Sequence, residues 1–334
     1  MKIIVEANIP YLRGLLEPFG EVRYLSAPEI DAAAVRDAHT LFVRTRTRCD
    51  ASLLEGSSVR FIATATIGTD HIDLDYCRRR GITVANAPGC NAPAVAQYVL
   101  STIGHYLNGS QVAGLTLGVV GVGHVGSIVA RWGEALGMKV LRCDPPRQRL
   151  EGGNFCSLDL IAREAEIITF HTPLTHSGDD ATFHLADSEF MRHAEQCRLL
   201  INAARGGVVD EQAVVEALQG GTLLAAAIDC WEHEPDINPR LLQYAFVATP
   251  HIAGYSAEGK CRAVAMTLDA FERHYGVTVK GKPTVDAPLE GVTPRSIGEV
   301  MSSYNPLNDT SLLQADPSQF EALRNGYRLR KEVR

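Results

Sequence analysis

Short apolar runs alternate with segments of helical pattern along most of the chain, and this alternation limits the fold more than any other feature. Such runs are typical of strands in a parallel sheet that helices cover on both faces. The first series of predicted strands is Lys2–Val5, Val22–Leu25, Thr40–Val43, Phe61–Ala65 and Thr83–Ala85. The second series is Thr116–Val120, Lys139–Cys143, Ile167–Phe170, Arg198–Asn202, Leu224–Ile228 and Phe246–Ala248. The pattern predicts an α/β protein with two doubly wound parallel-sheet domains of Rossmann-like or flavodoxin-like type.

Helical segments connect these strands and suggest where one domain ends and the next begins. The predicted helices are Tyr11–Phe19, Ala94–Leu107, His124–Leu136, Leu158–Arg163, Ser188–His193, Glu211–Leu218 and Ala257–Tyr275. Beyond them the chain is interrupted by prolines, and only Ser318–Leu329 has a helical pattern. We therefore expect a substrate domain from residues 1–92 and 255–277, a dinucleotide-binding domain at 93–254, and a C-terminal appendage for subunit contact at 278–334.

Composition and charge are those of an ordinary globular chain. The 334 residues are 46% hydrophobic and 21% charged, and the formal net charge of −7 argues against a nucleic-acid partner. The eight cysteines form no C-x-x-C pair and no zinc-like spacing, so we expect reduced thiols in a cytoplasmic protein and no metal site. The N-terminal apolar run is broken at Glu6 and is expected to be a strand, not a signal peptide. No apolar stretch approaches the roughly 20 residues that a membrane helix needs.

A glycine-rich turn follows the apolar run that ends at Val120. Gly121, Gly123 and Gly126 form a G-x-G-x-x-G pattern that opens a predicted helix, and Asp144 ends the next strand 18 residues later. In this context the first glycine permits a tight turn, the second lets a pyrophosphate approach the backbone, and the third lets helix and strand pack closely. An acid such as Asp144 binds the ribose diol and repels a 2′-phosphate, so the pattern predicts NAD and not NADP.

Three residues that follow later strands have the chemistry for oxidising a hydroxy acid. Arg205 can hold a carboxylate through two parallel hydrogen bonds. His251 can accept the hydroxyl proton near neutral pH, and Glu234 can hold the opposite ring nitrogen. Taken alone, an arginine or a histidine after a strand is most often a solvated loop residue. The set of three, each after a strand of one dinucleotide-binding domain, favours a site.

The chain resembles the D-isomer-specific 2-hydroxyacid dehydrogenase family in the motifs GVVGVGHVG, FHTPLT, INAARGGVVDE, DCWEHEP and TPHIAGYS. With ATATIGTDHID and NAPGCNAPAVAQYV, the resemblance covers about residues 1–275. It implies that Arg205, Glu234 and His251 are the catalytic set. The implied NAD-site residues are Gly121, Gly123, His124, Val125, Gly126, Asp144, Thr172, Ala203, Ala204, Arg205, Asp229 and Gly254.

Within the family, the chain is most similar to members that act on a phosphorylated hydroxy acid. This resemblance implies that Thr45, Thr66 and Tyr255 contact the substrate, and that Arg44 and Arg46 bind its phosphate. Exposed arginines at the edge of a domain explain that pair about equally well. The resemblance also implies a homodimer that forms through the C-terminal segment.

Two other functions remain open at the level of the sequence. The chain could be a phosphoglycerate dehydrogenase or a glyoxylate or hydroxypyruvate reductase, since these share the catalytic set. It could also be a non-catalytic NAD-sensing interaction protein, although such a protein has no need of a proton acceptor like His251.

Overall fold

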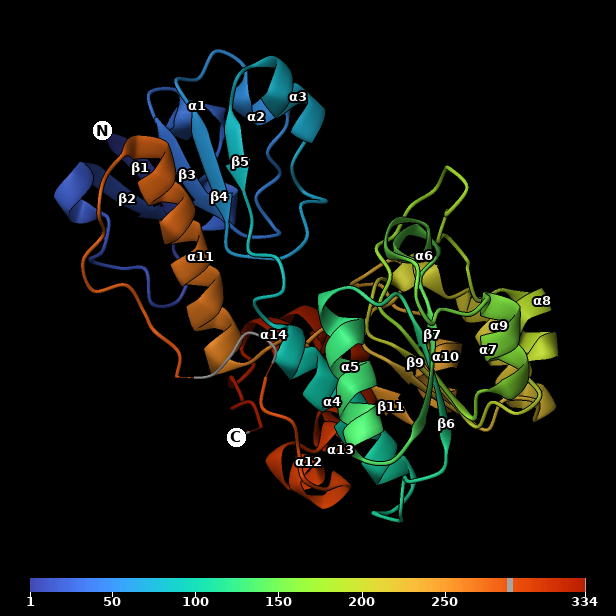
Figure 1. The fold of residues 1–334 in the computed structure, drawn as a ribbon. Helices are drawn as coiled ribbons and strands as arrows, with labels where there is room; N and C mark the ends of the chain where they lie inside the picture. The colour runs from blue at the N-terminus through green and yellow to red at the C-terminus, as the bar shows by residue number, and fades with distance from the viewer. Residues whose placement is uncertain (287–290, 334) are drawn as a thin grey trace. The chain divides into compact units, whose positions relative to one another are not determined.

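Two parallel sheets, each with helices on both faces, make up the computed structural model, which describes residues 1–286 and 291–333 (Figure 1). Residues 287–290 and 334 of the predicted appendage lie outside the described residues. Within the described part, residues 1–91 and 257–286 form one unit, and residues 92–256 and 291–333 form the other. The predicted α/β fold with two doubly wound sheets is confirmed, and each strand begins and ends within one residue of its predicted position.

The sheet of the first unit has the order β2-β1-β3-β4-β5, with all pairs parallel, which is the flavodoxin-like order. Its strands are β1 (Lys2–Glu6), β2 (Glu21–Leu25), β3 (Thr40–Val43), β4 (Phe61–Thr64) and β5 (Thr83–Ala85). Helix α11 (Ala257–Tyr275) packs on one face through Val264, Leu268 and Phe271. The other face packs against α1 (Ala32–Val35), α2 (Ala51–Leu54) and α3 (Leu74–Arg79).

The helix predicted at Tyr11–Phe19 is wrong, because only the 3-10 turn η1 (Glu17–Phe19) forms there. Tyr11 has a φ of +61° and Gly14 a φ of +89°, and both values lie in the left-handed region. An α-helix cannot pass through these conformations, so the segment runs as a series of turns.

The sheet of the second unit has the order β11-β10-β9-β8-β6-β7 and is also entirely parallel. Its strands are β6 (Thr116–Val120), β7 (Lys139–Cys143), β8 (Ile167–Phe170), β9 (Leu199–Asn202), β10 (Ala225–Ile228) and β11 (Val247–Ala248). The strand order reverses between β6 and β8. In open α/β sheets, ligands bind at the carboxyl ends of the strands beside such a reversal.

Helices cover both faces of this second sheet. Figure 1 shows α4 (Ala92–Tyr106) and α5 (His124–Ala135) on one side, and α7 (Leu158–Glu164), α8 (Ser188–His193) and α9 (Glu211–Gly220) on the other. Successive residues of a strand face opposite sides, so the sheet supplies two separate cores. The short helices α6 (Pro145–Glu151) and α10 (Pro239–Tyr244) follow β7 and precede β11.

The C-terminal segment is more helical than its sequence predicts. It contains α12 (Ile297–Ser303), α13 (Pro306–Ala315), the turn η4 (Pro317–Gln319) and α14 (Phe320–Asn325), so the prediction of a single helix is wrong. Pro306 stands at the start of its helix, after the cap Asn305, where the missing N–H of proline is harmless. The Thr310 hydroxyl accepts a hydrogen bond from the Ala248 amide, 3.0 Å, so α13 covers the edge of the sheet at β11.

Arg330, near the end of the chain, holds the loop that follows β11. Its side chain is buried, and its guanidinium donates to the carbonyl oxygens of Ile252 (3.0 Å), Tyr255 (3.2 Å) and Ala253. It also donates to the Ala94 carbonyl, 3.1 Å, at the start of α4. One buried cation therefore satisfies four backbone carbonyls from two distant parts of the chain.

The structure describes all eight cysteines as free thiols. In the described part of the chain, none of the helices combines the length and the apolar character needed to cross a membrane.

Replacing Arg330 by methionine should destabilise the second unit strongly, because the buried carbonyls lose their donors. We expect a cost of about 2 kcal/mol or more and a Tm that falls by roughly 5 °C. Thermal unfolding followed by circular dichroism measures this, with the exposed Arg328→Met variant as a matched control. Equal Tm values for the two variants would contradict the role assigned to Arg330.

Candidate active site

The glycine turn after β6 is shaped by the fold at two positions and left open at the third. Gly121 has a φ of +83°, and a Cβ on Gly126 would lie 2.0 Å from the Gly121 carbonyl oxygen. A Cβ on Gly123 would meet nothing within 4 Å, and its φ of −73° suits any residue. Helix α5 has Gly123 as its N-cap, and no side chain of the described residues accepts a hydrogen bond from its first turn. The backbone amides at the start of α5, such as those of His124 and Val125, are therefore available to a phosphate.

Two polar side chains stand next to this turn. Asp144 follows β7, and its carboxylate accepts hydrogen bonds from the Val122 amide, 2.8 Å, and the Arg147 amide, 3.0 Å. Thr172 follows β8, and its buried hydroxyl has no hydrogen-bond partner among the described residues. An open turn at a helix N-terminus, an acid beside it and an unused hydroxyl at the reversal of strand order fit a bound dinucleotide.

The segment after β9 carries Ala203, Ala204 and Arg205, of which Ala204 is buried. The Arg205 guanidinium is partly buried and donates to the Ala204 carbonyl, 2.8 Å. The Asn202 side chain donates to the carbonyls of Arg205, 2.9 Å, and Cys230, 3.2 Å. This asparagine therefore ties the loop that carries Arg205 to the loop after β10.

Asp229 is buried at the end of β10 and holds the loop after β11 through hydrogen bonds. Its carboxylate accepts hydrogen bonds from the Thr249 hydroxyl (2.7 Å) and from the amides of Ile252 (2.7 Å) and Ala253 (2.9 Å). The sequence assigned Asp229 to the NAD site, and a contact with NAD stays a prediction. What the structure adds is its hydrogen bonds to the loop that holds His251 and Gly254.

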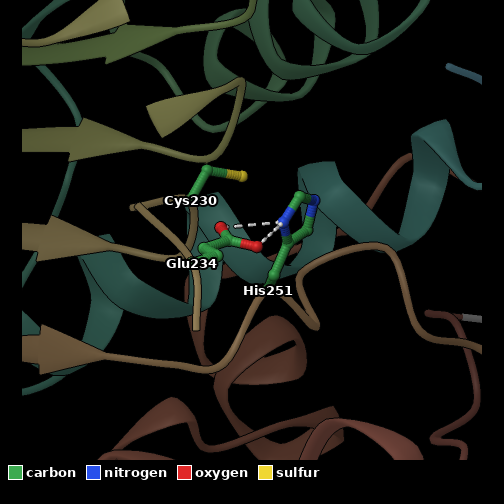
Figure 2. A group of neighbouring side chains, drawn as sticks. All are labelled: Cys230, Glu234 and His251. Carbon is green, nitrogen blue, oxygen red and sulfur yellow. Dashed lines mark hydrogen bonds and ion pairs between the residues drawn. The ribbon is translucent and has the colours of Figure 1, made fainter. Parts of the chain in front are cut away.

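His251 and Glu234 form a hydrogen-bonded pair (Figure 2). The His251 Nδ1 lies 3.0 Å and 2.9 Å from the two carboxylate oxygens of Glu234. The Trp231 amide also donates to Glu234, 3.0 Å, which fixes the carboxylate. His251 has a φ of +56°, a strained conformation that the surrounding loop must hold in place. Because Nδ1 is occupied by Glu234, Nε2 is the ring atom that can exchange a proton with a ligand.

The electrostatics of the pair favour a charged imidazole. Burial by itself lowers the pKa of His251, but the neighbouring Cys230 and Glu234 outweigh it and the pKa lies well above its ordinary value. Burial also raises the pKa of the Cys230 thiol, which is therefore protonated at neutral pH, so the Glu234 carboxylate supplies the charge that stabilises the imidazolium. Burial opposes ionisation of Glu234, and the hydrogen bond and charge of His251 lower its pKa on balance.

The structure brings the predicted catalytic residues to one edge of one sheet. Arg205, Glu234 and His251 follow β9, β10 and β11, which are neighbouring parallel strands, so all three lie at the carboxyl edge. Cys230 joins them, because its Sγ and the ligand atoms of Glu234 and His251 lie within 4.8 Å of one another. Such a trio can also bind a metal ion, but here the hydrogen bond at Nδ1 and the protonated thiol favour proton exchange.

The predicted substrate residues of the first unit lie after β3 and β4. The Arg44 amide donates to Glu6, 2.9 Å, and its guanidinium to the Asn8 carbonyl, 3.3 Å. Thr45 and Arg46 are exposed. The Thr66 hydroxyl is hydrogen-bonded to that of Thr64, 2.6 Å, and donates to the Gly68 carbonyl, 3.1 Å.

Sequence reasoning missed one residue of the site, Arg324 in α14. Its Nε donates to the Tyr255 hydroxyl, 3.3 Å, and its Nη1 lies 3.7 Å from a Glu234 oxygen. No motif or spacing pointed to it, because only the packing of the C-terminal segment brings it to the loop after β11.

Comparison with known proteins identifies the family. The sequence profile described as "D-isomer specific 2-hydroxyacid dehydrogenase, NAD binding domain" matches residues 95–253. A relative from Bacteroides thetaiotaomicron, named erythronate-4-phosphate dehydrogenase, is 45% identical over 99% of this chain and 97% of its own length. This chain belongs to the D-isomer-specific 2-hydroxyacid dehydrogenase family. It is therefore an oxidoreductase, and NAD is its cofactor.

A further relative and a solved structure are similar to this chain. A relative of the same name from Azotobacter vinelandii is 42% identical over 100% of this chain and 93% of its own length. The crystal structure of a D-lactate dehydrogenase from Aquifex aeolicus, complexed with NAD and lactic acid, is similar with a TM-score of 0.68 and 25% identity. It covers 83% of this chain and 96% of its own.

Alanine substitutions in the glycine turn should distinguish the glycine that stability requires from the one that cofactor binding requires. Gly123→Ala should keep the Tm of the parent and weaken NADH binding at least about tenfold, because the new Cβ occupies space left open for the pyrophosphate. Gly126→Ala should lower both the Tm and the affinity for NADH, because its Cβ collides with the backbone of Gly121. Thermal unfolding and NADH fluorescence titration measure the two effects. Unaltered NADH affinity in Gly123→Ala would show that the phosphate lies elsewhere.

Proposed function

We propose that this chain oxidises 4-phospho-D-erythronate to 2-oxo-3-hydroxy-4-phosphobutanoate with NAD, as a step of pyridoxal 5′-phosphate (vitamin B6) synthesis. The observation that carries the chemistry is the His251–Glu234 pair at the edge of the NAD-binding sheet, on strands next to that of Arg205. The substrate is supported by relatives named erythronate-4-phosphate dehydrogenase that are 41–46% identical over nearly the whole chain.

His251 is the proposed general base. Glu234 holds Nδ1, so the imidazole takes the proton of the substrate's 2-hydroxyl at Nε2. The charged imidazolium that results is stabilised by the adjacent carboxylate, whose pKa is held below its ordinary value by the hydrogen bond and charge of His251, although burial raises it. NAD, when bound, supplies the hydride acceptor of the reaction.

Arg205 is the proposed site for the carboxylate of the substrate. Its planar guanidinium binds a carboxylate through two parallel hydrogen bonds and so orients the carbon that carries the hydroxyl. The Asn202 hydrogen bonds fix the backbone of Arg205 relative to the loop after β10, which bears Glu234. Binding and proton transfer thus rest on neighbouring strands of a rigid sheet.

The remaining proposals concern the state of the protein in the cell. We propose a cytoplasmic homodimer that forms through the C-terminal segment. Eight free thiols support a reducing compartment. A hollow of about 740 Å³ on the C-terminal segment supports the interface; its lining includes Met301, Tyr304, Leu312, Leu323 and Tyr327. Sedimentation of the purified protein tests the dimer, and a monomer at micromolar concentration would contradict it.

Turnover with matched substrates tests the proposed reaction. We expect a kcat/KM for 4-phosphoerythronate at least about tenfold above those for 3-phosphoglycerate and glycerate, because the pocket is proposed to suit the longer phosphorylated acid. His251→Ala should lose about a hundredfold or more of turnover and still bind NADH, since the imidazole acts on the substrate proton. A preference for 3-phosphoglycerate would contradict the proposed substrate. NADH binding without turnover of any hydroxy acid would contradict the proposed dehydrogenase activity.

The pH dependence of oxidation should follow the His251–Glu234 pair. Oxidation needs the neutral imidazole, and the pKa of His251 is raised above 6.5, so kcat/KM should increase with pH along a limb whose midpoint lies above 6.5. Glu234→Gln removes the charge that favours the imidazolium, so the midpoint should fall by about one unit or more. Initial rates of the parent and of Glu234→Gln between pH 5 and about 10 measure the two midpoints. A midpoint that rises in Glu234→Gln would contradict the assignment of the pair.

A further inference from the structure

Arg324 lies at the site although it comes from the C-terminal segment. The residue stands on α14 (Phe320–Asn325), and only 17% of its side chain is exposed. Its Nε donates to the Tyr255 hydroxyl, 3.3 Å, and its Nη1 lies 3.7 Å from Glu234 Oε2, the oxygen that is 2.9 Å from His251 Nδ1. A guanidinium thus stands one side chain away from the proposed general base, within the same unit.

Most of the hydrogen-bonding capacity of this guanidinium is unused. An arginine has five N–H donors, and among residues 1–286 and 291–333 Arg324 makes one hydrogen bond, that to Tyr255. The separation from Glu234 is that of an ion pair and is too long for a hydrogen bond. Glu234 already accepts from His251 and Trp231, so it is engaged elsewhere. A mostly buried cation with four donors beyond the one that Tyr255 accepts has the chemistry to bind an anion.

We propose that Arg324, together with the Tyr255 hydroxyl, binds the phosphate of the substrate. The inference rests on the proposed function and deepens it. A phosphorylated hydroxy acid has an anionic group at each end, and Arg205 is assigned to the carboxylate, so a second cation is required. A guanidinium presents paired N–H groups that match two oxygens of a phosphate.

The proposed phosphate site differs from the one that the sequence predicts. The sequence placed the phosphate on Arg44 and Arg46 of the first unit, whereas the spare donors described here belong to the second unit. It also gives the C-terminal segment a role in substrate selection, since α14 supplies the cation. A hydroxy acid without a second anion leaves the donors of Arg324 without a partner, and the site discriminates against it for that reason.

Steady-state kinetics of Arg324→Gln test the proposal, with Arg328→Gln as the control. Arg328 lies four residues further along the segment and is exposed. We expect Arg324→Gln to raise KM for 4-phosphoerythronate at least about tenfold, because a charged hydrogen bond to the phosphate is lost. The affinity for NADH should stay that of the parent. Arg324→Lys should recover part of the loss, and Arg328→Gln should match the parent.

Binding to an inactive protein covers the case in which Arg324→Gln has no turnover. In a His251→Ala background with NAD present, calorimetry gives the Kd of 4-phosphoerythronate directly. Adding Arg324→Gln to this background should raise that Kd at least about tenfold.

Two outcomes would overturn the proposal: an unchanged KM, or an unchanged Kd in the His251→Ala background. A shifted pH midpoint together with the unchanged KM would mean that Arg324 acts only through Glu234. Failure of the proposed function is distinct, since the parent protein would then not turn over 4-phosphoerythronate at all.

Discussion

The arrangement of the site depends on how one short loop is held between two buried charges. The Asp229 carboxylate accepts the amides of Ile252 and Ala253, and the Arg330 guanidinium donates to carbonyls of the same two residues. A carboxylate at the end of a strand thus binds the amides of this backbone segment, and a guanidinium near the end of the chain binds its carbonyls. These hydrogen bonds hold His251 in its left-handed conformation, with its ring against Glu234. Backbone strain of this kind persists only where the surroundings supply many independent contacts.

The C-terminal segment is accordingly part of the site, although most of its residues lie far from the chemistry. It covers the edge strand through Thr310, fixes the loop through Arg330 and presents Arg324 to the His251–Glu234 pair. The three contacts extend from the sheet edge to the proposed general base along a single stretch of chain. If Arg324 binds the phosphate as proposed, stability and substrate selection are linked here, because a change in the packing of this segment affects both.

The sequence predicts the sheets well, because buried parallel strands are short apolar runs that need no information from elsewhere in the chain. It also predicts that Arg205, Glu234 and His251 share an edge, since residues after consecutive parallel strands lie on one side of a sheet. It fails at Tyr11, whose positive φ has no signature in the sequence. It fails again at the appendage, where a proline such as Pro306 starts a helix and does not interrupt one. Arg324 has no signature in the sequence, because its role depends on a contact between distant segments.

The order of the chain through the first unit affects its synthesis. Its sheet is complete after β5, but the face formed by residues such as Val5, Phe42 and Phe61 is covered by α11, which begins at Ala257. The ribosome makes the whole six-stranded sheet of the other unit in between. A newly made first sheet therefore presents an aromatic surface to solvent until that helix has emerged from the exit tunnel, and during this interval it is a target for chaperones and a risk for aggregation.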